Sequence, residues 1–400
     1  MMGAPVRTSE RRDPDVINPW LTGFSCIRCQ MELPVGDYPE GCPICLSRGT
    51  PASVRPVYGR LPDVVGNPQK RGMARYADWL PYRQWTSLGE GSTSCISAQP
   101  LADHMGMAGI FIKNEGQNPS GSHKDRVSGL TVTRACDVGA RGIVAASSGN
   151  AGASLALYAA AAGLRCSIVA TPALQPLHRR AITATGARLI TAGDSLERWK
   201  TVERMAREGW FPATNYLAPP VGSNAFGVEG LKTLAFELFE DLGAERLDAI
   251  FVPTSRGDLL WGLFQGFHQL REAGFIATLP RLFAIEPFPR ISRILAGESL
   301  DGSYPGSTSL YSIAGSTVTY QAVEAIRRSH GDAVTVVDAD VHRDFELLAQ
   351  YGFYLELSSA ATLTGLRTLI EHGAIARESC AVLIATSHGY KDQIVDGAAR

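Results

Sequence analysis

A lysine stands in an unusual setting in the segment "NPSGSHKDR", residues 118–126, shortly after the apolar run "GIFIK". A primary amine can condense with a carbonyl group, and burial can lower its pKa toward neutrality, so Lys124 is a candidate for covalent and acid–base chemistry. The segment also fits an ordinary helix start, in which Ser122 caps the helix, Asp125 follows it and Lys124 is solvated. The remaining motifs have to decide between these interpretations.

Four cysteines form two CxxC pairs separated by 12 residues: Cys26, Cys29, Cys42 and Cys45. This spacing lets four thiolates surround one zinc ion, and four sulfur ligands leave no open position for a substrate, so we expect a structural zinc. Two disulfides in an exported protein are the alternative, but residues 1–15 lack the apolar segment of a secretory signal. The other cysteines are expected to be small core residues of a reduced, cytoplasmic compartment: Cys95, Cys136, Cys166 and Cys380.

The overall charge is nearly balanced, with 38 basic and 39 acidic residues and a pI near 6.7. Such a chain lacks the positive excess that favours nucleic acid or an anionic membrane as a partner. The longest uncharged run, residues 142–164, is interrupted by polar residues such as Asn150, and a strand, loop and helix explain it better than a membrane span. We therefore expect no nucleic-acid or membrane partner.

The elements that must position these residues are short β-branched runs alternating with amphipathic helices. The expected strands are "GIFIK", "GIVAAS", "RCSIVAT", "ARLITA", "DAIFVPT", "RLFAIEP" and "CAVLIAT", and "VEGLKTLAFELFEDLG" is an expected helix. This alternation predicts parallel α/β sheets covered on both faces. Four of the strands run into polar tails, "NEGQNPSGSHK", "SSGNAG", "TSRGD" and "TSHG". Because ligands bind at the carboxyl ends of parallel strands, the four tails could line one cleft.

These motifs together resemble the pyridoxal-phosphate enzymes of the tryptophan synthase β fold (fold type II), and most of all threonine synthases. The resemblance covers nearly the whole chain and rests on "SLGEGST", "KNEGQNPSGSHKDR", "ASSGNAGASLALYAA", "VEGLKTLAFE", "LELSSAATLTGL" and "TSHGYKD" in order. Residues 1–20 are expected to be disordered or loosely ordered. The resemblance implies a zinc ribbon (21–58), a large cofactor-binding α/β domain (59–118 and 225–400) and a small α/β domain (119–224). The cofactor cleft lies between the two α/β domains, and a homodimer is expected.

The resemblance also assigns site residues. Lys124 would form a Schiff base with the cofactor aldehyde and then move protons on the substrate. Asn150 would contact the phenolic oxygen of the cofactor, while Ser147, Ser148 and Gly149 would hold the substrate carboxylate. Thr386 would face the pyridine nitrogen, with Ser387 as a possible substitute. His123 either lies near the cofactor phosphate or is bonded to the backbone at a helix terminus.

The segment "TSRGDL" matches the glycine-rich loop that holds the cofactor phosphate in the family, which assigns cofactor contacts to Ser255, Arg256, Gly257, Asp258 and Leu259. Only Gly257 remains a glycine. An arginine can add a charge-assisted bond to phosphate, whereas a carboxylate would repel it, so we expect Asp258 to turn away.

The most consequential departure concerns the substrate. Threonine synthases carry an arginine that grips the substrate phosphate in a segment resembling NPYRxEGxKT, and this chain reads "NAFGVEGLKT" with Gly227 at that place. Loss of such a contact costs roughly 2–5 kcal/mol, or about thirtyfold to several-thousandfold in binding, unless Arg256, Lys232 or another residue compensates. We therefore expect elimination or replacement at the β or γ carbon of a small amino acid. Threonine synthesis from O-phosphohomoserine, serine or threonine dehydration, and a non-catalytic binding protein are the alternatives.

Overall fold

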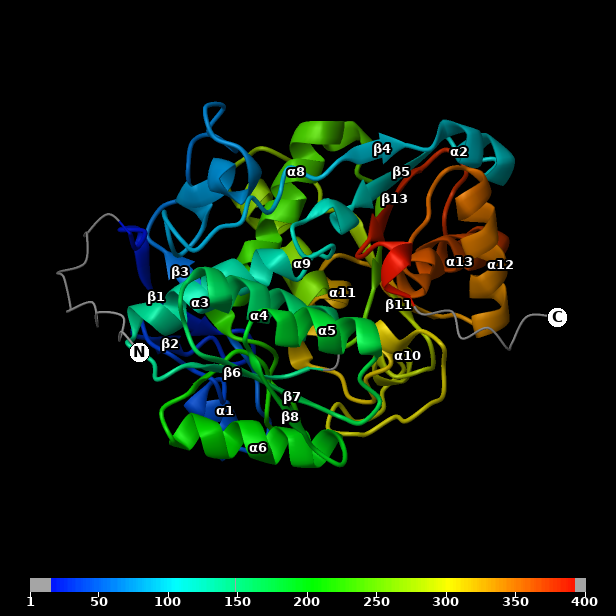
Figure 1. The fold of residues 1–400 in the computed structure, drawn as a ribbon. Coiled ribbons are helices and arrows are strands. Elements are labelled where there is room, and N and C mark those ends of the chain that lie inside the picture. The colour runs from blue at the N-terminus through cyan, green and yellow to red at the C-terminus, as the bar shows by residue number, and fades with distance from the viewer. Residues whose placement is uncertain (1–15, 148, 393–400) are drawn as a thin grey trace.

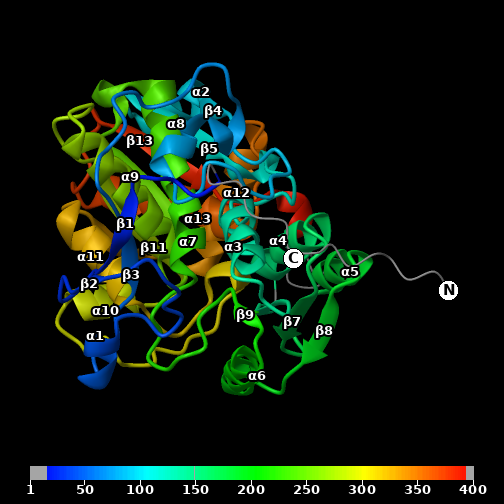
Figure 2. The same ribbon diagram turned by 90° about the vertical axis from the view of Figure 1, so that its left-hand side faces the viewer.

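The computed structural model describes residues 16–147 and 149–392, which form three sheets and the helices around them (Figure 1). The N-terminal sheet is antiparallel in the order β2-β1-β3, and Figure 2 shows it well apart from β7 and β8. Its strands are β1 (Leu21–Cys26), β2 (Glu32–Leu33) and β3 (Val54–Tyr58), with the short helix α1 (Pro43–Ser47) between the last two.

The largest sheet has six strands in the order β12-β11-β10-β13-β5-β4, all parallel except for the edge strand β4. The strands are β4 (Cys95–Ser97), β5 (Gly109–Asn114), β10 (Ala249–Pro253), β11 (Arg281–Glu286), β12 (Asp332–Thr335) and β13 (Cys380–Ala385). Alternate residues face opposite cores. Ile250 and Val252 belong to the core with α8 (Lys232–Leu242) and α9 (Asp258–Glu272), whereas Phe251 belongs to the core with α13 (Leu357–Glu371).

The second α/β unit contains a four-stranded parallel sheet in the order β8-β7-β6-β9. Its strands are β6 (Ile143–Ala146), β7 (Cys166–Ala170), β8 (Arg188–Thr191) and β9 (Phe211–Pro212). Ile143 faces the core beneath α3 (Asp125–Asp137) and α4 (Asn150–Ala161), and Val144 faces the core beneath α6 (Ser195–Arg207), so helices cover both faces (Figure 1). The seven predicted strands are all present, and the predicted α/β class with largely parallel sheets is confirmed.

The longer helices connect and cover these strands. They are α2 (Gln99–Met105), α3 (Asp125–Asp137), α4 (Asn150–Ala161), α5 (Pro176–Ala184), α6 (Ser195–Arg207), α8 (Lys232–Leu242), α9 (Asp258–Glu272), α11 (Tyr320–Arg328), α12 (Asp338–Gln350) and α13 (Leu357–Glu371). The shorter ones are α7 (Ala225–Val228) and α10 (Ile291–Leu295), with 3-10 turns η3 (Glu229–Leu231) and η6 (Gly389–Lys391). No helix in the described ranges is long and apolar enough to span a bilayer, and the uncharged run 142–164 contains β6 and α4.

Three expectations need correction. The helix predicted over "VEGLKTLAFELFEDLG" is divided into α7, η3 and α8. It is buried on nearly every side, and its charged residues Lys232 and Glu237 can be buried because each of them forms an ion pair. Most of the N-terminal segment predicted to be loosely ordered, residues 1–15, lies outside the described residues, but Asn18 is buried and bonded to the Leu80 carbonyl. Cys136 is exposed rather than a core residue.

Candidate functional site

Lys124 is the last residue before α3, and the segment around it is fixed from two sides. Arg126, two residues further on, is fully buried and forms ion pairs of 2.7 Å with both Glu115 and Glu237. These contacts anchor the start of α3 to the end of β5 and to α8. The environment of Lys124 is therefore set by a buried ionic network, and not by the helix cap that the simpler interpretation assumed.

The C-terminal segment "TSHG" runs alongside this lysine segment. The backbone N–H of His123 donates to the Thr386 carbonyl at 3.1 Å, and the Ser387 hydroxyl donates to the Gly121 carbonyl at 2.9 Å. The His123 ring also contacts the Thr386 carbonyl through Nδ1 at 3.3 Å, which agrees with the backbone-bonded interpretation. Burial, followed by the charge of Lys124, holds the pKa of His123 well below its usual value, so the ring is neutral.

Lys124 is a half-buried residue that lines a cavity between α3, α4 and α9. The lining residues are Lys124, Val127, Ser128, Thr131, Ala145, Ala151, Leu155, Ala213, Thr214, Ser223 and Asp258. Among these described residues, Lys124 carries the only cationic side chain. Desolvation lowers the pKa of Lys124, with help from Arg256, while the carboxylates of Asp258 and Glu356 oppose the change. A lysine with a lowered pKa can carry out proton transfer near neutral pH.

The loop at residues 254–259 joins β10 to α9, and Asp258 is one of the residues that line the Lys124 cavity. Whether its carboxylate turns away from a bound phosphate stays a prediction. It accepts hydrogen bonds from the Ser223 hydroxyl and from Nε2 of Gln321, both at 2.5 Å. Asp258 therefore links α9 to α11 and to the segment that precedes α7.

The remaining residues of the loop have different environments. Gly257 has a left-handed φ of 99° and packs against Ala322, a conformation and a space that suit only glycine. The Arg256 guanidinium lies 5.1 Å from the ring centroid of Trp199, whereas the Leu259 side chain is buried in the hydrophobic core. Ser255 is held through its carbonyl by Arg290, a buried residue that the sequence did not indicate.

Asn150, the first residue of α4, contacts two side chains that sequence reasoning missed. Its Nδ2 donates to the two carboxylate oxygens of Glu356 at 3.3 and 3.1 Å, and its Oδ1 lies 3.3 Å from Nε2 of His178. Burial raises the pKa of Glu356 to about 7, and nearby Asp392 adds to this effect. The sequence signal was present for Glu356, since a charged residue between two leucines in "LELSS" is unusual; no comparable signal marked His178.

The loop before α4 holds the residues that were predicted to bind the substrate carboxylate. The Ser147 hydroxyl accepts from the Gly152 amide at 2.8 Å and from the Gly149 amide at 3.4 Å, so it caps the helix. Ser148 lies outside the described residues. Thr386, predicted to face the pyridine nitrogen, exchanges a hydrogen bond of 2.9 Å with the Ser359 hydroxyl. Lys391, which we did not single out, donates to the Ser120 carbonyl at 2.7 Å.

Position 227, where the resemblance places an arginine in threonine synthases, has no room for a side chain. A Cβ atom there would overlap Oγ1 of Thr131 and lie 3.0 Å from Cγ1 of Val127. Lys232 does not replace the missing charge, because its fully buried amine is bonded to the Trp79 carbonyl and to Gln269 and is paired with Glu229.

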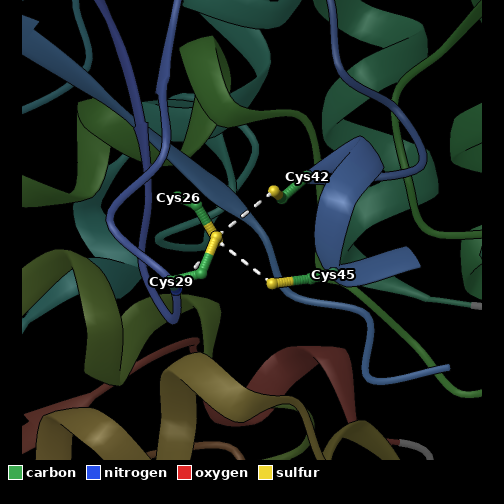
Figure 3. A group of neighbouring side chains, drawn as sticks. All are labelled: Cys26, Cys29, Cys42 and Cys45. Atoms are coloured by element: carbon green, nitrogen blue, oxygen red, sulfur yellow. Dashed lines mark hydrogen bonds between the residues drawn. The ribbon is translucent and has the colours of Figure 1, made fainter. Parts of the chain in front are cut away.

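The four predicted metal ligands lie together near the N-terminal sheet (Figure 3). The sulfur atoms of Cys26 and Cys45 are 3.6 Å apart, those of Cys29 and Cys42 are 3.7 Å apart, and all four lie within 4.8 Å of one another. Zinc–sulfur bonds of about 2.3 Å in a tetrahedron place sulfurs about 3.8 Å apart, whereas disulfide sulfurs are about 2.05 Å apart. The cluster therefore fits a zinc ion and does not fit two disulfides.

The residues around Lys124 also fit pyridoxal phosphate. An amine with a lowered pKa is present, the amide of Asn150 lies close to Glu356, and the amino end of α9 with Arg256 can attract an anion. Asp258 is the one residue of the loop that acts against an anionic group.

An α/β protein with a lysine at the carboxyl end of a parallel sheet, facing a second, smaller sheet, has the architecture of the fold type II class. A comparison with known families bears this out. The chain belongs to the family of pyridoxal-phosphate dependent enzymes, whose pattern matches residues 86–387.

Within this family, the chain is similar in sequence to threonine synthases. The chain is 31% identical over 351 residues to the threonine synthase of Methanocaldococcus jannaschii, covering 84% of this chain and 85% of that one. It is 31% identical over 338 residues to the threonine synthase of Mycobacterium tuberculosis, covering 83% and 91%.

Solved structures share the fold at lower identity. The structure of an O-ureido-L-serine synthase matches with a TM-score of 0.61 and 24% identity over 77% of this chain and 93% of that one. An L-serine ammonia-lyase from Rhizomucor miehei matches with a TM-score of 0.64 and 21% identity over 78% and 96%. At these identities the likeness concerns the fold alone.

Proposed function

We propose that this chain catalyses elimination or replacement at the β or γ carbon of a small amino acid whose leaving group is not a phosphate. The observation that carries the proposal is the cavity that Lys124 shares with neutral hydroxyls and one carboxylate, next to a position 227 that is closed by Thr131. Among the described lining residues, a dianionic phosphate would meet the Asp258 carboxylate, and Lys124 carries the one cationic side chain that could neutralise it. A hydroxyl leaving group needs no such neutralisation.

The described residues have separate tasks in this proposal. The amino end of α4, through the positive end of its helix dipole, attracts the substrate carboxylate. Lys124 removes the proton from the substrate α carbon, and Val127 and Leu155 exclude water from the cavity. Pyridoxal phosphate, when bound, supplies an electron sink that stabilises negative charge at that carbon. Asn150 and Thr386 are the proposed contacts to its ring, and Ser255, Arg256 and the amides of residues 257–259 are those to its phosphate.

A substrate panel tests the proposal. The purified protein with added cofactor is incubated with L-serine, L-threonine and O-phosphohomoserine, and ammonia, keto acid and threonine are measured. We expect turnover of a hydroxyl amino acid and little from the phosphorylated one, and no turnover in Lys124→Ala. Normal threonine formation from O-phosphohomoserine would instead make the chain a threonine synthase with a relocated phosphate site.

We also propose that the four cysteines hold one structural zinc ion, on the strength of the sulfur–sulfur distances. The division into a large and a small domain around the cavity is proposed from the two separate parallel sheets. The homodimer stays a prediction, and sedimentation analysis of the full chain tests it.

A further inference from the structure

The amide of Asn150 lies between an acid and an imidazole that come from different units of the fold. Glu356 precedes α13, which packs on the six-stranded sheet, and it accepts from Nδ2 of Asn150. His178 belongs to α5 beside the four-stranded sheet, and its Nε2 lies 3.3 Å from Oδ1. Each partner therefore holds one end of the amide.

Both partners can reverse their hydrogen-bonding roles. An ionised carboxylate only accepts, whereas a protonated one also donates, and a neutral imidazole can carry its hydrogen on either nitrogen. Burial, together with Lys391, lowers the pKa of His178 to about 4, so the ring stays neutral at ordinary pH. Nδ1 of His178 is buried and has no hydrogen-bond partner among the described residues, so no second bond fixes the tautomer.

The carboxyl of Glu356 is surrounded by groups that control its charge. Lys124 faces it from the start of α3, His178 lies beyond the amide, and Lys391 and Asp392 come from the C-terminal turn. Burial and Asp392 raise the pKa of Glu356 to about 7, against the opposing effects of Lys391 and of hydrogen bonds from Ser387 and Asn150. The carboxyl therefore changes its charge close to neutrality.

We propose that Glu356 and His178 are positioning residues that determine which way the amide of Asn150 faces. With Glu356 ionised, the NH₂ group of the amide faces Glu356 and its oxygen accepts from His178. When solvent protonates Glu356, its O–H donates to Oδ1, and Nδ2 turns to donate to Nε2 of His178. The imidazole hydrogen is then on Nδ1, so each partner keeps a bond to the amide.

This inference rests on the proposed function, since it takes Asn150 as a contact to the cofactor ring. Turning the amide over exchanges a donor for an acceptor at that contact. The absorbance of the bound cofactor should therefore follow the charge of Glu356, as well as any charge change of Lys124.

The test is an absorbance titration of the cofactor-loaded protein from pH 5.5 to 8.5. We expect a transition centred near pH 7, its absence in Glu356→Gln, and its retention in Glu346→Gln, which removes an exposed carboxyl on α12. Asp392→Asn removes a charge that raises the pKa of Glu356, and its side-chain oxygen can still accept from the Leu357 amide. The midpoint of this variant should therefore lie at a lower pH than that of the wild type.

The outcomes separate this inference from the proposed function. A wild-type protein that binds no cofactor would rule out both the proposed function and this inference. A cofactor band that depends on Lys124, with a pH response equal in the wild type and Glu356→Gln, removes only the positioning role. If Glu356→Gln does not fold, as circular dichroism would show, the Asp392→Asn midpoint decides, and a midpoint equal to that of the wild type overturns the inference.

Discussion

Thr131 on α3 and Gly227 on α7 are packed so closely that the Thr131 hydroxyl oxygen occupies the place of a side chain on residue 227. The carbonyl oxygen of Val127 lies 3.1 Å from the same place, and α3 begins directly after Lys124. A position that the sequence marked as a substrate contact in similar proteins is thus a helix-packing contact here. The close approach of α3 and α7 therefore leaves no space for a side chain at position 227.

Gly227→Ala should therefore destabilise the fold. Overpacking of a filled site costs about 1–3 kcal/mol, and the neighbours here include backbone that cannot move aside. Thr131→Ala in the same chain should recover part of the loss. Gly36→Ala is the matched control, because a Cβ there meets only the Tyr38 ring at ordinary distances of 3.4–3.6 Å. Thermal unfolding measures all three, and an unchanged Gly227→Ala would show that the contact is not tight.

Asp258→Asn should lower the pKa of Lys124 further. The Asp258 carboxylate opposes the lowering caused by desolvation, so its neutralisation leaves the ammonium form less stable. In cofactor-free protein, the pH at which acylation of Lys124 is half-maximal should move to lower values, as followed by peptide mass spectrometry. Asp301→Asn, at an exposed position, should leave it unchanged. A shift to higher pH would mean that Asp258 does not act on this amine.

Burial of Glu356 should make the cofactor-free protein less stable as the pH rises. A folded-state pKa raised from 4.5 to about 7 means that this stabilising contribution is complete below pH 4.5 and is lost as the pH passes 7. The shift corresponds to roughly 3 kcal/mol at about 1.4 kcal/mol per unit, as an upper bound for a group with coupled neighbours. Glu356→Gln should thus be more stable than the wild type at pH 8 and similar to it at pH 4.5. Urea unfolding at the two pH values measures the difference.

Cys45→Ser should remove the metal and weaken the N-terminal sheet. The wild type should contain about one zinc ion per chain, and loss of one thiolate opens the tetrahedral site. We expect a melting temperature lower by several degrees and zinc-free protein by elemental analysis. Cys136→Ser, at an exposed cysteine outside the cluster, should keep the metal. A wild-type protein without zinc, or with disulfides on mass analysis, contradicts the assignment.

The strands and the cluster of four cysteines could be predicted from sequence because their signals are local. An apolar run such as residues 109–113 carries its own pattern, and two CxxC pairs carry a geometry in their spacing. Lys124 also stood out, since a lysine among glycine and serine after an apolar strand is distinctive. Each of these features depends on residues close together in the chain.

The missing parts depended on contacts between distant segments. Asn150, His178 and Glu356 meet only after the two sheets are assembled, and no one segment shows that an amide will lie between an acid and an imidazole. Lys232 looked available as a cation until its partners at Trp79 and Gln269 were known. The orientation of Asp258 likewise follows from Ser223 and Gln321, which no local rule connects to it.

The N-terminal cysteine-bearing sheet cannot be treated as a removable appendage. The ring centroids of Phe24 and Phe226 are 5.1 Å apart, and the Asp37 carboxylate accepts two hydrogen bonds from Arg134 on α3, at 2.9 and 2.8 Å. A fragment beginning at residue 59 would lack Phe24 and Asp37. The Phe226 ring would then be exposed to water, and Arg134 on α3 would lose its ion pair with Asp37. Shortening the chain so that it begins at residue 59 should therefore yield an aggregating product, and purification should retain the first 58 residues.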